Sequence, residues 1–148
     1  MAPDELIEVI FAKGHRNILA THPTTLEITK EDEVSRRGDC IIAVSADKTM
    51  KDFSEAFKAK LRKDTVRLTI LVEAGGTAEI IKAYGGSHLT LEDPLEMVVR
   101  KSSYSCGRTL ALKADKAAKD LAKTLVQELR NPGQKVKVTL SVNTQPRS

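Results

Sequence analysis

Aromatic residues are scarce in this 148-residue chain, which has three phenylalanines, two tyrosines and no tryptophan. Proteins that bind single-stranded nucleic acid stack bases on aromatic side chains, and this sequence offers few platforms of that kind. No stretch approaches the roughly 18 apolar residues of a membrane-spanning helix. The chain starts with two acids, Asp4 and Glu5, where a secretory signal peptide needs positive charge and then an apolar run. We therefore expect a cytoplasmic protein with no membrane partner.

Only two cysteines are present, Cys40 and Cys106, which is too few for a disulfide framework. A reducing cytosol would keep both as free thiols. The chain also has few Asn, Gln and Met and many Lys and Glu, the compositional trend of thermophilic proteins. Because intracellular disulfides occur in such organisms, a bridge between the two cysteines stays open as an alternative.

The charge balance is mildly basic, with 24 Lys and Arg against 20 Asp and Glu and a net charge of +4. This balance permits an anionic partner without requiring one. The 41% hydrophobic and 30% charged residues are typical of an ordinary globular domain, and the length is sufficient for a sizeable core. We expect one domain over residues 1–148.

The chain resembles itself after a shift of about 70 residues, which indicates an internal repeat. Residues 8–14 align with 79–85 after a shift of 71, and residues 46–48 align with 114–116 after a shift of 68. The hydrophobic pattern repeats as well. Each half has one apolar stripe at helical spacing followed by strict alternation of apolar and polar residues, which predicts a strand with one buried face.

The same elements are therefore predicted in both halves. The first half is predicted to contain strands at 5–13, 24–30, 40–46 and 65–73 and a helix at 48–62. The second is predicted to contain strands at 78–84, 95–101, 108–114 and 135–142 and a helix at 116–131. Further short strands are predicted at 18–21 and 89–91, and a mobile tail at 143–148.

Two repeat units, about 5–73 and 77–142, would meet at Gly75 and Gly76. Two residues are too few to link separate domains, so we expect the halves to fold together. The predicted fold is α+β and mainly β: a pseudo-twofold barrel or sandwich made of two tandem β-β-β-α-β units, with two amphipathic helices packed on it.

Five segments resemble a known family: residues 14–15, 21–29, 37–40, 45–48 and 100–104. They are similar to an archaeal family catalogued as domain of unknown function 371, and the resemblance covers nearly the whole chain. It implies an archaeal, single-domain, mainly β protein of sandwich type. It implies no activity, cofactor or catalytic residue.

The starts of the two predicted helices are the first candidate site. Asp47 and Asp115 are predicted N-caps, and four lysines fall in the first turns that follow: Lys48, Lys51, Lys116 and Lys119. One interpretation is a capped helix with solvated lysines. The other is a duplicated phosphate or carboxylate site, because helix N-termini attract anions.

The loops before the third strand of each half are the second candidate. They share small hydroxyl residues, glycine and several cations: Arg36, Arg37, Arg100, Lys101 and Arg108. Guanidinium groups and backbone amides bind phosphate, so we include these five residues in the predicted anion-binding set. No phosphate-loop spacing is present, and a simple polar hairpin loop is the alternative.

Histidine and cysteine residues without a counterpart in the other half are the third candidate: His15, His22, His88, Cys40 and Cys106. His22 matches Asp93, and each precedes a proline, so both are expected to organise turns. The spacings HxH, HExxH and CxxC are missing, so a metal would need ligands from distant segments and we predict no metal site. Whether the protein uses a cofactor is not indicated by the sequence.

Three functions follow from these features. The first is a binding domain for an anionic partner, either RNA or a phosphorylated metabolite. The second is an enzyme for a small phosphorylated or carboxylated substrate, with His15, His22 or Cys106 as acid, base or nucleophile and Arg37 or Arg108 holding the anion. The third is a subunit-interface protein that pairs through exposed strand edges. Convergence of the histidines and cysteines beside a basic residue would favour the enzyme.

Overall fold

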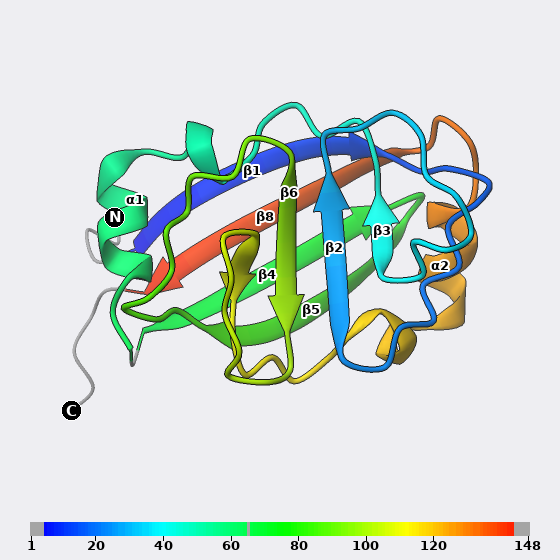
Figure 1. Ribbon diagram of the computed structural model, residues 1–148. Helices are drawn as coiled ribbons and strands as arrows, with labels where there is room; N and C mark the ends of the chain where they lie inside the picture. The colour runs from blue at the N-terminus through cyan, green and yellow to red at the C-terminus, as the bar shows by residue number, and fades with distance from the viewer. Residues whose placement is uncertain (1–4, 65, 144–148) are drawn as a thin grey trace.

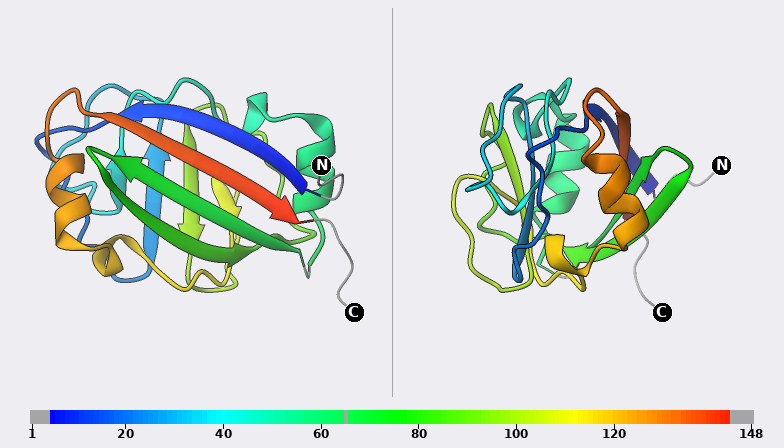
Figure 2. Two further views of the ribbon diagram at one scale, coloured as in Figure 1. Left: turned by 180° about the vertical axis from the view of Figure 1, so that it is seen from behind. Right: turned by 90° about the vertical axis from the view of Figure 1, so that its right-hand side faces the viewer.

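The computed structural model describes residues 5–64 and 66–143 and shows two four-stranded β-sheets packed face to face (Figures 1 and 2). Sheet A has the strand order β1 (Glu5–Lys13), β8 (Lys135–Asn143), β4 (Arg67–Ala74) and β5 (Thr77–Tyr84). Sheet B has the order β3 (Ile41–Ala43), β2 (Thr25–Thr29), β6 (Glu96–Arg100) and β7 (Thr109–Ala111).

Alternation of apolar and polar residues explains the strands of sheet A. In β4, Leu68, Ile70 and Val72 are fully buried, and the residues between them face outward. All neighbouring strands of sheet A are antiparallel. In sheet B, β2 and β6 form an antiparallel centre, and the short strands β3 and β7 run parallel to them at the edges. One hydrophobic core lies between the two sheets.

Isolated bridges join the corners of the two sheets, between Lys13 and Val44 and between Tyr84 and Leu112. Among the described residues the sheets do not close into a barrel. The prediction of a mainly β, α+β fold is therefore confirmed, and its barrel alternative is wrong.

The helices lie at opposite ends of the two sheets (Figures 1 and 2). A 3₁₀ turn, η1 (Met50–Asp52), precedes α1 (Glu55–Leu61), and η2 (Ala118–Asp120) precedes α2 (Lys123–Leu129). The single helices predicted at 48–62 and 116–131 are thus wrong. A buried carboxylate accounts for the break in the first half, because Glu8 accepts the backbone N–H of Ser54 at 2.8 Å just before α1. Glu79 accepts the N–H of Ala122 at 2.7 Å before α2.

The predicted N-caps are wrong for the same reason. Ser54, not Asp47, caps α1, and its hydroxyl accepts the N–H of Phe57 at 3.1 Å. The N-cap position of α2 is Ala122 rather than Asp115.

Asp47 and Asp115 instead accept hydrogen bonds from strands. The carboxylate of Asp47 accepts the N–H of Phe11 in β1, and that of Asp115 accepts the N–H of Lys82 in β5, each at 3.0 Å. These aspartates fasten the segment before each 3₁₀ turn to the edge of sheet A.

Two weak strands predicted at 18–21 and 89–91 are also wrong. Ala20 and Leu91 have φ angles of 52° and 55°, which an extended strand excludes. Ile18 and Leu89 are nevertheless buried, so the apolar alternation there reflects loop residues packed on the core. Of the predicted tail, Asn143 is the last residue of β8, and residues 144–148 lie outside the described residues, as does Thr65.

Glycines at the ends of β1 and β5 bring the halves together. A Cβ on Gly14 would collide with the carbonyl oxygen of Leu129, and a Cβ on Gly85 would collide with the carbonyl oxygen of Leu61. The end of α2 therefore packs against the first half, and the end of α1 packs against the second. None of the helices in the described part of the chain is long and apolar enough to cross a bilayer.

Candidate functional site

Two of the four lysines at the predicted helix starts, Lys48 and Lys116, have carboxylate partners. The Nζ of Lys48 lies 2.6 Å from a carboxylate oxygen of Glu8, and the Nζ of Lys116 lies 3.2 Å from one of Glu79. Lys51 and Lys119 are exposed residues of the 3₁₀ turns. The two inner lysines thus complete internal ion pairs and present little free charge to an anion.

His22 organises a turn, as predicted. Its Nδ1 accepts the backbone N–H groups of Thr24 and Thr25, each at 3.2 Å. The carboxylate of Asp93 accepts the N–H groups of Leu95 and Glu96 at 3.0 and 2.7 Å. His22 and Asp93 thus accept hydrogen bonds from equivalent backbone N–H groups at the starts of β2 and β6.

His15 lies in an open cleft of about 440 Å³ at the end of β1. Its Nδ1 accepts the N–H of Asn17 at 3.0 Å, and its Nε2 lies 3.0 Å from the carboxylate of Glu33. The cleft walls also carry Lys13, Arg16 and Asp32, so charges of both signs face it. His88 is exposed elsewhere, and neither cysteine lines this cleft.

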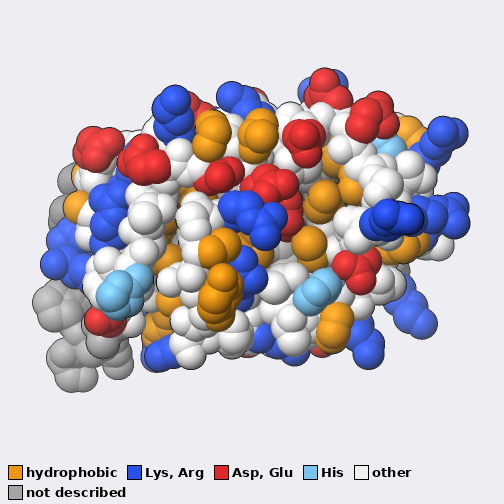
Figure 3. Space-filling model, viewed as in Figure 1, with side chains coloured by type: hydrophobic (Ala, Val, Ile, Leu, Met, Phe, Trp, Pro, Cys, Tyr) orange, Lys and Arg blue, Asp and Glu red, His pale blue; other side chains and the backbone are white. Residues whose placement is uncertain are grey.

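A polar network instead occupies the outer face of sheet B. Its centre is Glu27 of β2, which is only 4% exposed although it points away from the core. Burial, and next the neighbouring Glu96 of β6, raise the pKa of Glu27 to about 7. The guanidinium of Arg108 donates to Glu96 at 2.9 Å, which raises the pKa of Arg108. In the space-filling view, acidic and basic side chains lie together in the middle of this face (Figure 3).

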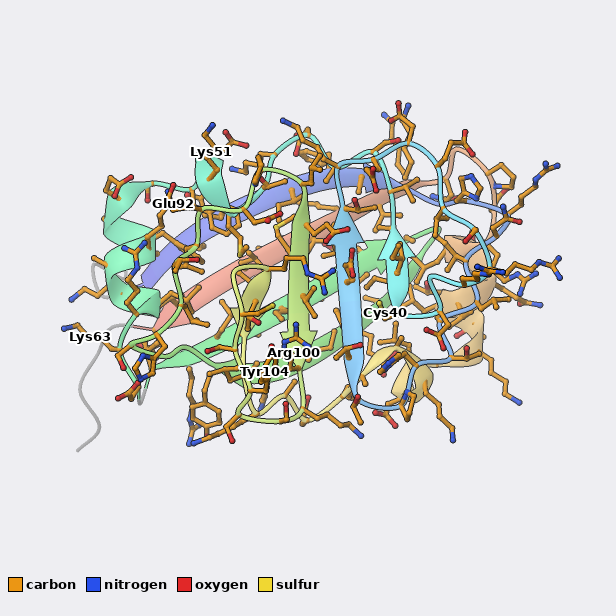
Figure 4. The ribbon with its side chains drawn as sticks, in the orientation of Figure 1. Cys40, Lys51, Lys63, Glu92, Arg100 and Tyr104 are labelled. Carbon is orange, nitrogen blue, oxygen red and sulfur yellow. The ribbon has the colours of Figure 1, made fainter. Side chains whose placement is uncertain are left out.

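Cys40 lies at one side of the network, beside β3 (Figure 4). Its Sγ is 3.5 Å from a carboxylate oxygen of Glu27. Burial, followed by the Glu27 carboxylate, raises the pKa of the Cys40 thiol to about 12. This thiol is therefore protonated at neutral pH and unreactive.

Cys106 lies at the other side of the network, in the turn before β7. Its neighbour is a cation, whereas the neighbour of Cys40 is a carboxylate. The guanidinium of Arg100 donates from Nη2 to Sγ at 3.2 Å, and the Thr109 hydroxyl lies 3.8 Å from Sγ. Burial would raise the pKa of this thiol. Hydrogen bonds from the Arg108 backbone N–H, Thr109 and Arg100 outweigh it, so the pKa is lowered.

Arg100 is held in place from three sides. Its Nε donates to the Thr109 hydroxyl at 2.9 Å, its Nη2 donates to Cys106, and its guanidinium lies 5.1 Å from the ring centroid of Tyr104. Figure 4 shows Arg100 and Tyr104 next to each other at the lower end of β6. Arg100 is partly buried, and no carboxylate forms an ion pair with it within residues 5–64 and 66–143. A fixed guanidinium with no counter-ion is suited to an anion.

The structure brings some predicted site residues together and leaves others apart. Arg100, Cys106 and Arg108 meet on sheet B, whereas the histidines do not join them. Lys101 is paired with Asp120 at 2.8 Å. The remaining predicted cations, Arg36 and Arg37, are exposed in the loop before β3.

Both cysteines are free thiols, so the disulfide alternative is wrong. No cluster of three His, Cys, Asp or Glu side chains suited to a metal ion occurs in the described part of the chain.

Sequence reasoning missed Glu27, Glu96, Thr109 and Tyr104. A signal for Glu27 was present, because it is a charged residue within a strand whose other residues are apolar or hydroxyl-bearing, TLEIT. Glu96 carried no such signal. Glu96 lies beside Glu27 because β2 pairs with β6. This pairing places Glu27 opposite Val98, and Glu96 is two residues before Val98, on the same face of the sheet.

Comparison with known proteins places the chain in a family. The family described as "Domain of unknown function (DUF371)" matches residues 10–143. An uncharacterised protein of Methanocaldococcus jannaschii is 48% identical over 122 residues, which cover 82% of this chain and 90% of that protein. Neither description mentions an activity. The resemblance found in the sequence is confirmed, and the chain belongs to the family catalogued as domain of unknown function 371.

Proposed function

We propose that the protein binds the phosphate or carboxylate group of a small metabolite on the outer face of sheet B. The binding group is Arg100, together with Arg108 and the turn that holds Cys106; we call this the Arg100 site. The observation that carries the proposal is the state of Arg100, which is fixed by three neighbours and has no carboxylate partner among the described residues.

The surroundings of Arg100 favour a small ligand. Thr109 and Cys106 already occupy Nε and Nη2, so the free edge of the guanidinium has room for one anionic group. Tyr104 is 63% exposed and leaves the site open to solvent. Arg108 adds a second positive charge, although Glu96 holds it at 2.9 Å. A guanidinium that is already oriented loses little side-chain entropy when it binds.

Titration calorimetry with inorganic phosphate and with citrate tests the proposal. The Arg100→Gln variant should bind at least 10-fold more weakly than the natural protein, because a hydrogen bond to a charged group is worth about 1.5–3 kcal/mol. Arg130→Gln is the matched control, since Arg130 is exposed beyond α2, and its affinity should not change. Equal affinity in both variants, or no binding of either anion, would refute the proposal.

A second candidate is an enzyme that uses Cys106 as its nucleophile. The specific observation is the contrast between the thiols: the pKa of Cys106 is lowered beside Arg100, and that of Cys40 is raised. In its thiolate form, which the lowered pKa favours, Cys106 would attack an electrophilic centre of an anionic substrate while the bond from that centre to the leaving group breaks. Glu27, which keeps its proton up to about pH 7, is the candidate proton donor to the leaving group. Loss of turnover in Cys106→Ser with anion affinity retained would support this function.

We also propose that the fold arose by duplication of a unit of about 70 residues, and that the protein works in a reducing cytoplasm. Left-handed backbone recurs at matching places, Ala20 with Leu91 and Ser45 with Lys113, which supports the duplication. The N–H groups of Glu27 and Val98 bond to the carbonyl oxygens of Cys40 and Arg108, each at 2.8 Å. Cys40 and Arg108 would then be counterparts in the two copies. The polar network would include positions at which the two copies now carry different residues.

A further inference from the structure

The outer face of sheet A is open. Figure 2 shows the four strands from this side, with α1 and α2 at the two ends rather than across the face. Strands β1 and β8 pair over nine residues each, from Glu5–Asn143 to Lys13–Lys135. At about 3.3 Å per residue along a strand and about 4.8 Å between strands, the face measures roughly 30 by 15 Å.

Positive charge predominates on this face. Five cations point outward from its strands: Lys13, Arg67, Lys82, Lys135 and Lys137. None of them forms an ion pair within the part of the chain that the structure describes. Among the described side chains of the face, Glu73 is the one acid. The charge on this face therefore has no internal partner.

The face also carries exposed apolar side chains on its two edge strands, β1 and β5, including an aromatic ring. Phe11 is 52% exposed, and Ile7 and Ile80 are 54% and 46% exposed. The register aligns Val9, Thr139, Leu71 and Ile80 in a row across all four strands. Phe11 lies beside this row and directly opposite Lys137. Apolar surface flanked by cations thus runs across the sheet.

The positive charge of this face determines which kind of partner can bind its apolar surface. A second copy of the chain, packed on the same face about a twofold axis, would bring ten cations together against few acids, and like charges across an interface oppose association. An anionic partner meets the cations and the apolar row at once. Single-stranded RNA has this composition, because its phosphates pair with lysine and its unstacked bases lie on apolar and aromatic side chains.

We infer that the outer face of sheet A, through its five outward cations and Phe11, is a docking surface for single-stranded RNA. It is separate from the Arg100 site, which lies on the outer face of the opposite sheet. The inference does not depend on small-anion binding, and either one could fail alone. Although aromatic residues are few in the sequence, the fold exposes one of the three phenylalanines on the edge strand β1 of a basic sheet, next to Lys137 of β8.

Fluorescence anisotropy with a labelled ten-nucleotide oligouridine tests the inference. For single strands, log K falls with log salt at a slope of about −0.7 for each phosphate neutralised. If all five cations bind phosphates, the affinity should fall roughly 100-fold between 50 and 200 mM salt. The Lys135→Gln/Lys137→Gln double variant should lower the slope by about 1.4.

Phe11→Leu separates base stacking from charge. It keeps an apolar side chain at an exposed position and removes the aromatic plane, so it should weaken binding about 5- to 150-fold without changing the salt slope. The charge-matched control is Lys63→Gln/Lys123→Gln, because both lysines are exposed at or beside the helices, away from this face. The control should bind as the natural protein does.

Four results would overturn the inference. One is no binding of oligouridine at 50 mM salt. Another is an equal loss of affinity in the control and in the Lys135/Lys137 variant, which would indicate only general charge attraction. The third is binding of polyglutamate in preference to RNA, which would indicate an acidic protein partner. The fourth is a dimer in sedimentation velocity that Phe11→Leu dissociates.

Discussion

The buried carboxyl group of Glu27 makes the stability of the protein depend on pH, and Glu27→Gln should remove that dependence. Burial and the neighbouring Glu96 raise the pKa of Glu27 from 4.5 to about 7. Between these pH values the folded protein retains a proton that the unfolded chain releases. The stability contributed by this group is thus fully present below pH 4.5 and is lost as the pH rises through 7.

The loss amounts to about 1.4 kcal/mol for each pH unit across this window, or roughly 3 kcal/mol by pH 8. The free energies of unfolding of Glu27→Gln and the natural protein should be similar near pH 4.5. At pH 8 the variant should be more stable by about 3 kcal/mol. Urea denaturation followed by circular dichroism at both pH values measures this difference.

The control for this experiment is Glu31→Gln, which makes the same chemical change at an exposed loop position. It should leave the pH dependence of unfolding as it is in the natural protein. The reasoning is refuted if Glu27→Gln has the same stability as the natural protein at pH 8, or if the difference between the two does not grow with pH.

Two other predictions concern thiol reactivity and close packing. Iodoacetamide at pH 7.5 should modify Cys106 and leave Cys40 intact. Of the two thiols, Cys40 is the one whose pKa is raised to about 12, so it has roughly 1,000-fold less thiolate than an ordinary thiol. Equal modification of both cysteines in peptide mass spectra would contradict this prediction. Gly85→Ala should lower the free energy of unfolding by about 1–3 kcal/mol, since its Cβ would meet the Leu61 carbonyl. Gly107→Ala, with open space, should not change the urea midpoint.

Strands were predictable where one face is buried along the whole element. The alternation of apolar and polar residues at 66–72 and 136–142 indicated β4 and β8. In the pairing of these two strands, buried residues lie opposite buried residues, such as Ile70 opposite Leu140. The helices were predicted too long, because the stripe that includes Met50 and Phe53 is indeed buried but lies on a 3₁₀ turn and its cap. Periodicity reports which residues are buried and does not show where a distant carboxylate such as Glu8 interrupts a helix.

The site was less predictable than the fold. Arg100 and Arg108 were recognised as candidates because cations, small hydroxyl residues and glycine share one loop, and Cys106 because it has no counterpart in the other half. The contact of Arg108 with Glu96, and the closeness of Glu96 to Glu27, depend on how β2 pairs with β6, and hydrophobic spacing does not specify strand pairing. For Lys48 and Lys116 at the predicted helix starts, sequence reasoning did not identify the carboxylate partners, which come from β1 and β5, far away in sequence.

Tyrosine fluorescence tests the Arg100 site most directly. The chain has no tryptophan and two tyrosines, so a Tyr84→Phe protein emits from Tyr104 alone, and the Tyr104 ring lies 5.1 Å from the Arg100 guanidinium. Inorganic phosphate should change this emission in a saturable way, whereas sodium chloride of equal ionic strength should not. Adding Arg100→Gln to the Tyr84→Phe protein should abolish the response to phosphate. A flat titration, or a response that chloride reproduces, would contradict small-anion binding at Arg100.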